Sequence, residues 1–406
     1  MFLETILIGL GIVALLLVLG ALALEIRYRR HPGNDLVMTS GDWNLEVYEP
    51  HRYLLVGEPE LPSRSPRVEI MVLEVEADVT LLSKGSLDEI THTIKVTPRH
   101  PDTPARPDGY WFGYIIKRHK TTRLEVSLDI RGKELNQLQA AWVRIRYLTY
   151  GPRGRIPKVC HVIVPLKFPA TEDSQRWRPT LHADVLPVKT HLLTQLDNPV
   201  EIVKRYVMPH AQPGDIVTIG ETPVAVMQGR FHHPSEVRPG WVAKRLCFYF
   251  MTTSTLSSAC GMQTLVDIVG PVRVVFAFVA GAIAKKFLNQ PGMFYQLAGE
   301  QARLIDDVTG TLPPYDQFIV LGPENPQQVV DQIKAETGLS AAIVDVNDLK
   351  AVNIVASTSG IPKGLLEQAL VSNPAGNDDQ QTPVVLIRPT ETAVNPKSAQ
   401  HSKPTT

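Results

Sequence analysis

The chain has 406 residues, with 41 basic side chains, 41 acidic side chains and 44% hydrophobic residues. This composition is typical of folded proteins, and it excludes a disordered chain, a collagen-like repeat and a disulfide-rich mini-domain. The zero net charge argues against a nucleic acid as the main partner, because nucleic-acid-binding domains usually carry a basic excess. The length predicts two domains with additional segments, each domain long enough to bury its own core.

An apolar segment lies at the start of the chain. Residues 5–24 contain no charged side chain, and a helix of that length spans the roughly 30 Å hydrocarbon core of a bilayer. Glu4 precedes the segment, whereas Arg27, Arg29 and Arg30 follow it, so the positive-inside rule places the following domains in the cytoplasm. We predict a single-pass anchor in the cell membrane, with the N-terminus outside. A cleaved secretory signal is the alternative, although its basic residues normally precede a shorter apolar run.

Alternating apolar and polar residues follow a connecting segment. Prolines and glycines interrupt residues 31–65, which predicts a juxtamembrane connector after the anchor of residues 1–30, with one short strand near residues 53–56. Residues 66–180 then show a period of two, which is typical of strands with one buried face. We expect a small antiparallel β-sandwich-like domain here. The clearest alternation covers residues 73–79, 124–130 and 143–147.

The second half has the pattern of an α/β domain, so the whole chain is predicted to be a mixed α/β protein. Within residues 181–388 we expect helices at 200–207 and 327–337 and strands at 216–219 and 341–345. The uncharged stretch 274–284 has about half the length of a membrane span, and we interpret it as a buried core segment. Residues 389–406 form a tail that is too polar to pack.

The acidic residues of the second half carry the strongest chemical signal. Asp306 and Asp307 are adjacent in a turn-like context, and Asp345 and Asp348 lie at the end of a predicted strand. Carboxylates at strand ends are ligands for Mg²⁺ or Mn²⁺, and such a cation can bind phosphate oxygens. The alternative is that these acids cap helices and stabilise turns.

Four basic residues are candidate anion contacts: Arg230, Arg303, Lys285 and Lys286. Arg230 closes a glycine-flanked apolar run at residues 220–230, but this run lacks the spacing of a P-loop or of a dinucleotide fingerprint. Arg303 precedes the Asp306–Asp307 pair, and its alternative role is on a solvated face.

Read in order, segments of the second half resemble the family of coenzyme F-420 γ-glutamyl ligases. The resemblance covers roughly the C-terminal half and leaves the apolar segment and the β-domain unmatched. It implies a mixed α/β fold, often dimeric, that uses GTP and a divalent metal to activate a carboxylate as an acyl phosphate and join it to glutamate. It also implies that Asp345 and one of Asp306 and Asp307 hold the metals. The matching segments are 186–190, 214–219, 228–230, 305–308, 321–326 and 343–345.

Two departures from the family pattern leave two hypotheses open. Ala225 and Val226 replace a Ser-Lys pair, and residues 346–350 replace a Thr and a Gly-Arg after Asp345. The first hypothesis is a membrane-anchored ligase with Asp348 as an accessory metal ligand, Arg230 as a nucleotide or anion contact and an unidentified small-molecule substrate. The second is a non-catalytic relative that serves as a binding or assembly platform at the cytoplasmic membrane face.

Overall fold

A computed structural model gives the architecture, and it describes residues 2–30, 33, 36–65, 68–169, 176–251, 254–290, 292–299, 301–307, 312–346, 351–376 and 380–390. The fold is mixed α/β, as expected. The chain divides into two compact units, the first of residues 1–78, 92–130 and 144–161 and the second of residues 79–91, 131–143 and 162–406. From residue 391 onward, the predicted polar tail lies outside the described residues.

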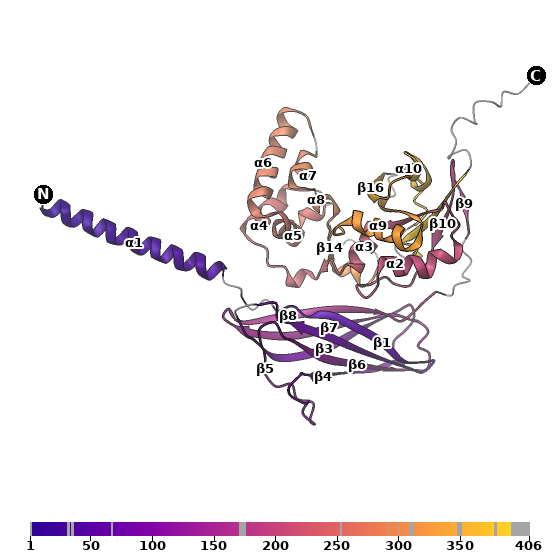
Figure 1. Ribbon diagram of the computed structural model, residues 1–406, viewed down its shortest axis with the longest axis horizontal. Helices are drawn as coiled ribbons and strands as arrows, with labels where there is room; N and C mark the ends of the chain where they lie inside the picture. The colour runs from indigo at the N-terminus through magenta and orange to yellow at the C-terminus, as the bar shows by residue number, and fades with distance from the viewer. Residues whose placement is uncertain are drawn as a thin grey trace, which may run out of the picture. The chain divides into compact units, whose positions relative to one another are not determined.

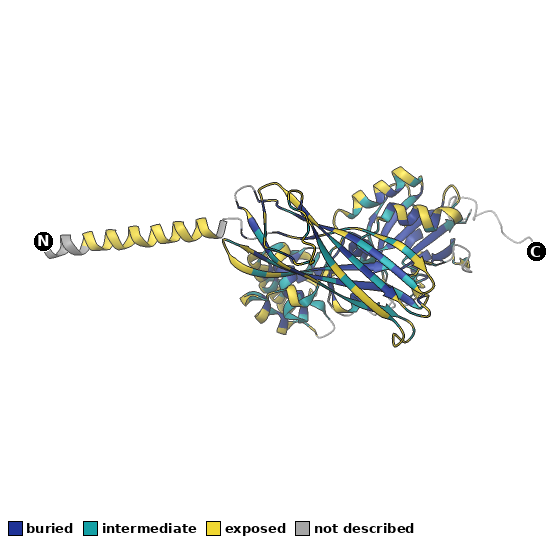
Figure 2. Ribbon diagram, turned by 90° about the horizontal axis from the view of Figure 1, so that it is seen from below, coloured by how far each residue is buried: buried dark blue, intermediate teal, exposed yellow. Residues whose placement is uncertain are grey.

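The N-terminal segment forms one long helix, α1 (Phe2–Arg30). Its portion Ile8–Tyr28 is long and apolar enough to cross a membrane, and its side chains are exposed throughout (Figure 2). Exposed aliphatic side chains on all sides of a helix are typical of a segment that lies in lipid.

The β-domain contains two four-stranded sheets (Figure 1). The alternation of apolar and polar residues predicts the interior of this domain correctly, since Leu124, Val126, Leu128 and Ile130 are all buried. The first sheet has the order β1 (Thr39–Glu49), β2 (Arg52–Pro62), β6 (Thr121–Arg131) and β4 (Thr91–Arg99). The second has the order β5 (Tyr114–Ile116), β3 (Ile70–Ser83), β7 (Leu138–Gly151) and β8 (Gly154–Pro165).

The prediction of a connector at residues 31–65 is wrong for most of its length, because β1 and β2 lie there and pair antiparallel. Two of the prolines and glycines that suggested a connector, Gly41 and Pro59, lie at a bulge. The register shifts between Thr39 and Asp42, opposite Glu58–Glu60, and Gly41 adopts φ +63° within the shift. A bulge interrupts the hydrogen-bond ladder, which is where a strand tolerates a proline such as Pro59.

A six-stranded sheet forms the centre of the second unit. Its strands β11 and β15 are parallel, whereas β17 pairs antiparallel with both β10 and β11. These strands agree with the predictions at 216–219 and 341–345. The order is β16 (Val352–Ser357), β15 (Ser340–Val346), β11 (Ile216–Gly220), β17 (Val384–Pro389), β10 (Ala183–Val188) and β9 (Arg178–Pro179).

Helices cover both faces of this sheet, because successive strand residues point to opposite sides. On one face Val217 and Ile219 pack in a cluster with Val330 of α9 (Pro326–Thr337), the predicted helix. On the other face Ile216 packs in a cluster with Leu366 of α10 (Leu365–Leu370). The predicted helix at 200–207 begins as α2 (Pro199–Ile202) and continues as a wider π-helical turn, Val203–Val207.

The chain between β11 and β15 contains short strands and a helical group. A small sheet has the order β12 (Phe231–His232), β14 (Ile319–Val320) and β13 (Asp306–Asp307). The helices are α3 (Glu221–Met227), α4 (Trp241–Leu246), α5 (Ala259–Val269), α6 (Pro271–Phe287), α7 (Met293–Ala298) and α8 (Gln301–Leu304). The interpretation of 274–284 as a buried segment is wrong: Val274, Ala277 and Ala284 are buried, but most of the other α6 side chains are exposed.

Candidate functional site

A cavity of about 450 Å³ lies in the second unit where the parallel strands β11 and β15 end. In open α/β sheets ligands bind in the crevice outside the carboxyl ends of such strands. Gly220 at the end of β11 and Asp345 near the end of β15 both line the cavity, as do Thr190 and Gln381 from the segments beside β10 and β17. The parallel pairing therefore places residues from distant parts of the sequence around one hollow.

Charged groups of both signs line this cavity. Asp345 is half-buried, and desolvation raises the pKa of its carboxyl, an effect that the positive charge of Arg303 opposes. Glu221, the first residue of α3, is buried and lines the same cavity. Arg303 is exposed, and it is the only Lys or Arg among the described lining residues. Two carboxylates and one guanidinium are groups that can bind a cation and an anion in the same site.

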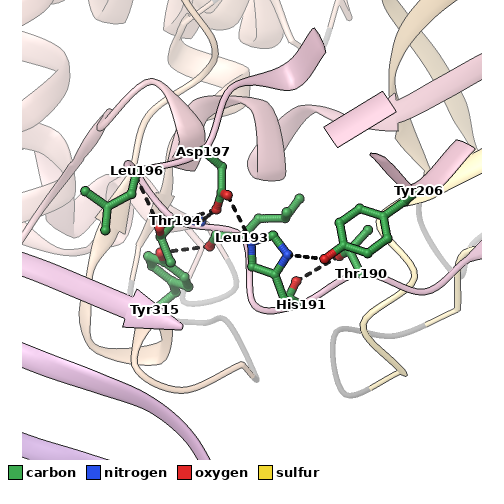
Figure 3. Close-up of polar contacts among 8 residues, drawn as sticks. All are labelled: Thr190, His191, Leu193, Thr194, Leu196, Asp197, Tyr206 and Tyr315. Carbon is green, nitrogen blue, oxygen red and sulfur yellow. Dashed lines mark hydrogen bonds and ion pairs between the residues drawn. The ribbon is translucent and has the colours of Figure 1, made fainter. Parts of the chain in front are cut away.

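A hydrogen-bonded network fixes the wall after β10 (Figure 3). The buried imidazole of His191 has its Nδ1 2.7 Å from the Tyr206 hydroxyl and its Nε2 2.9 Å from Asp197 Oδ1. The backbone N–H of Thr194 donates to Asp197 Oδ2 at 2.8 Å. Burial raises the pKa of Tyr206. Both ring nitrogens thus have partners, and His191 connects the loop after β10 to the Tyr206 side chain.

Tyr315 closes another side of the cavity. Its hydroxyl donates to the Leu193 carbonyl at 3.0 Å, and burial raises the pKa of the phenol well above its usual value. The ring packs edge-on against Phe231, with 5.6 Å between the ring centroids. Tyr315 therefore stays neutral and connects the 312–320 segment to the same loop that carries His191.

The structure places the predicted metal ligands unequally. Asp345 lines the cavity. Asp306 and Asp307 pair through their backbones with Val320 and Ile319, but their side chains lie outside the described part of the structure, as does all of Asp348. Among the side chains that are described, no three His, Cys, Asp or Glu groups could hold a metal ion together. Asp345 and Glu221 line the same cavity, and carboxylate oxygens are the donor type that Mg²⁺ or Mn²⁺ prefers.

Arg230 does not line the cavity. Its Nε donates to the Gly322 carbonyl at 2.7 Å, and its Nη1 lies 3.4 Å from Glu324. Nucleotide or anion binding by Arg230 stays a prediction. Arg303 lines the cavity and is exposed, so both of its predicted roles, the anion contact and the solvated face, stay predictions.

The two apolar replacements lie in the hydrophobic interior. Ala225 and Val226 belong to a buried cluster with Tyr315, Phe318 and Val320. Val226 also lines the cavity, so this part of the wall is apolar. Sequence reasoning did not single out Glu221 or His191. The available signal for Glu221 was its position directly after Gly220, which ends β11. The two partners of His191, Asp197 and Tyr206, lie six and fifteen residues further along the chain.

Comparison with known families finds a match to the β-domain. The family model described as "F420-0:gamma-glutamyl ligase, N-terminal Ig-like domain" matches residues 37–168. This corrects the expectation that the β-domain is unmatched, because the match coincides with its two sheets and includes the segment predicted to be a connector. The resemblance of residues 181–388 to the ligases stays a prediction. A search of curated proteins finds no match to the chain.

Solved structures give similarities to small domains. The GAE domain of GGA2p from Saccharomyces cerevisiae aligns at 7% identity over 32% of this chain and 97% of that domain, with a TM-score of 0.20. The yeast GGA1 GAE domain aligns at 12% identity over 32% of this chain and 91% of that one, with a TM-score of 0.18. These TM-scores are too low to establish a shared fold.

Proposed function

We propose that this chain is a membrane-anchored γ-glutamyl ligase-like enzyme, which uses GTP and Mg²⁺ or Mn²⁺ to join a carboxylate substrate to glutamate. The observation that carries the proposal is the position of Asp345 on a cavity at the carboxyl end of β15, together with Glu221 and Arg303. The match of the β-domain to the N-terminal domain of a γ-glutamyl ligase family supports the same conclusion from an independent part of the chain.

The proposed chemistry depends mainly on charge. Transfer of a phosphoryl group requires positioning and neutralisation of the phosphate oxygens, and bound divalent metal ions supply both. Asp345 and Glu221 would hold such an ion, with Asp306, Asp307 and Asp348 as further proposed ligands. Arg303 would contact an anionic group of the nucleotide or the substrate. The apolar wall at Val226 and Phe318 would exclude water from an acyl phosphate.

A non-catalytic binding role is the second candidate, and the buried positions of Ala225 and Val226 favour it. A Lys at Val226 would point a cation into the cavity, whereas valine presents only methyl groups there. Among the described lining residues there is no lysine, so a triphosphate would have fewer charged contacts here than in a site with a lysine at position 226. A platform that binds an anionic ligand without transferring phosphate would need no more than Arg303 and a cation held by the two carboxylates.

The proposal also includes location. The α1 segment would anchor the chain as a single pass in the cell membrane, and the arginines after it would hold both following domains on the cytoplasmic side. A protease added to sealed cells should spare a C-terminal reporter tag, and cleavage of that tag from outside would contradict this orientation.

Calorimetry on the full-length protein in detergent tests the ligand chemistry. Mn²⁺ and GTP should bind to the wild type, and Asp345→Asn should weaken Mn²⁺ binding at least tenfold, which corresponds to about 1.4 kcal/mol. Asp331→Asn on the exposed side of α9 is the matched control and should bind as the wild type does. Absence of both Mn²⁺ and GTP binding by the wild type would contradict the enzyme. Binding of both without phosphate release in the presence of glutamate and a panel of small carboxylates would favour the platform.

A further inference from the structure

The exposed side of α6 and its neighbours forms an apolar surface, which we call the α6 surface. On α6, Val272 is 81% exposed and Phe276 62% exposed. The adjoining loop adds Phe248, which is 84% exposed. The other exposed apolar members of the surface are Trp241, Tyr249, Met251, Val275, Val279, Ile283, Phe287 and Leu288.

These residues form a continuous region of the second unit. The ring of Tyr249 lies 5.2 Å from that of Phe278 in the middle of α6, and α4 also contacts α6. Only a narrow stripe of α6, containing Val274 and Ala277, packs into the helical core beneath. A helix that is apolar all round is normally enclosed by protein or by lipid. Soluble proteins rarely leave an apolar area of this extent in water.

The charge around the α6 surface indicates what kind of partner covers it. Residues 237–299 contain six Lys and Arg side chains and a single acid, Asp267. Lys285 and Lys286 lie at the C-terminal end of α6, and the Arg245 guanidinium lies 4.4 Å from the centroid of the Trp241 ring. Basic side chains beside apolar and aromatic ones suit a bilayer surface with anionic headgroups. A second copy of the chain would instead bring two cationic surfaces together, which electrostatic repulsion opposes.

We propose that the α6 surface docks on an anionic phospholipid bilayer, with α6 lying in the headgroup region rather than crossing. The α5 and α6 axes meet at 112° beside Gly270, so the pair cannot form one straight span. Arg273 and the two lysines confine the apolar part of α6 to a length shorter than the hydrocarbon core. Trp241 and Tyr249 are the residue types that settle at the level of the headgroups. This contact is separate from α1 and from the ligase chemistry.

Site-directed spin labelling of the full chain in vesicles tests the docking. Nitroxides are placed by Phe276→Cys and Ile283→Cys on α6, and by Ala335→Cys on the exposed side of α9 as control. The parent carries Cys260→Ser, because Cys160 and Cys247 are already buried. The vesicles contain phosphatidylglycerol and phosphatidylcholine. Power saturation measures how often each nitroxide collides with oxygen, which concentrates in lipid, and with a nickel chelate, which stays in water.

The ratio of oxygen collisions to nickel-chelate collisions should be several-fold higher at positions 276 and 283 than at position 335. The difference should be smaller in vesicles of phosphatidylcholine alone. Replacing Lys285 and Lys286 with Gln should reproduce the effect of the neutral vesicles. Equal values at 276, 283 and 335 would overturn the proposal. So would spin–spin broadening that disappears on dilution with unlabelled chain, because that result assigns the surface to a second copy. A label at Leu15→Cys reports the α1 anchor separately, so failure of the anchor and failure of the docking are distinguishable.

Discussion

The guanidinium of Arg388 forms a bidentate ion pair with the carboxylate of Asp215. The Nε to Oδ1 distance is 3.0 Å and the Nη2 to Oδ2 distance is 2.7 Å. The side chain of Asp215 is only 2% exposed, and the pair raises the pKa of Arg388 further. Arg388 also lies 4.2 Å from the centroid of the Trp177 ring. The pair thus connects the turn before β11 to the end of β17.

We expect Arg388→Met to destabilise the second unit by about 3 kcal/mol, because it leaves the Asp215 carboxylate buried without a charged partner. The midpoint of urea denaturation of the full chain measures the effect. Arg99→Met removes the exposed ion pair with Glu125 and should cost less than about 1 kcal/mol. Equal losses in the two variants would show that the burial of Asp215 has no energetic consequence.

Asp345→Asn should raise the unfolding temperature at pH 7. Burial raises the folded-state pKa of Asp345, so its contribution to stability is fully present below the unfolded pKa of about 3.9 and is lost as the pH rises through the folded pKa. At neutral pH the wild type carries a half-buried negative charge that asparagine lacks. The difference between the two proteins should vanish below about pH 4, as a pH series of thermal unfolding will measure.

If Asp345 binds a divalent cation, adding that cation should make the wild type more stable than Asp345→Asn. Free Mn²⁺ at a hundred times its dissociation constant stabilises the wild type by about 2.7 kcal/mol, whereas the variant gains little. Asp331→Asn should follow the wild type in both series. A variant that is no more stable than the wild type at pH 7 would contradict the proposed cost of the buried charge.

His100 should make the β-domain sensitive to acid. Burial lowers its pKa to about 4, an effect that the charge of Asp102 opposes. The ring stacks on Tyr114 at 3.7 Å between centroids, and its Nδ1 lies 2.7 Å from Thr122 Oγ1. Because the unfolded chain takes up the proton near pH 6.5, stability is fully present above that pH and falls as the pH decreases toward 4.

Replacing His100 with Gln should flatten the pH dependence of unfolding between about pH 6.5 and 4. His92→Gln, at an exposed position on β4, is the matched control. Near-ultraviolet circular dichroism at a series of pH values follows the transition. An unchanged slope in the His100 variant would assign the acid sensitivity to other groups.

Gly41→Ala should destabilise the β-domain by more than the 1 to 2 kcal/mol that left-handed backbone alone costs an alanine. A Cβ at Gly41 would collide with the Glu58 carbonyl in the bulge between β1 and β2. Gly154→Ala is the control, since Gly154 also has positive φ but has open space around it. Thermal unfolding should rank the wild type above Gly154→Ala and Gly154→Ala above Gly41→Ala.

The sequence predicts the strands whose alternation is regular, and it fails where packing decides. The residues of β6 alternate strictly, so their buried face could be read directly. In β1 and β2 the prolines and glycines resemble those of a connector. The bulge that accommodates them forms only when the two strands pair, so it cannot be recognised from the local sequence. In α6 the absence of charge indicated burial, yet composition alone does not distinguish a protein interior from another apolar surrounding.

The candidate site was predictable only in part for a similar reason. Asp345 lies near the end of a recognisable strand, so its position there could be predicted. The cavity wall at His191 depends on Tyr206 and Asp197, and their contacts require the loop after β10 to fold back on itself. Glu221 faces the cavity because β11 and β15 are parallel neighbours, a pairing that the sequence does not state.

The central position of β17 has a consequence for the time course of synthesis. This strand lies between β10 and β11, so neither can complete its hydrogen bonds until residues 384–389 have left the ribosome. Until then both strands have open edges, which are prone to pair with other chains. The β-domain, whose strands end at Pro165, can fold much earlier. We therefore expect the six-stranded sheet to need protection by chaperones while the β-domain is already in its native form.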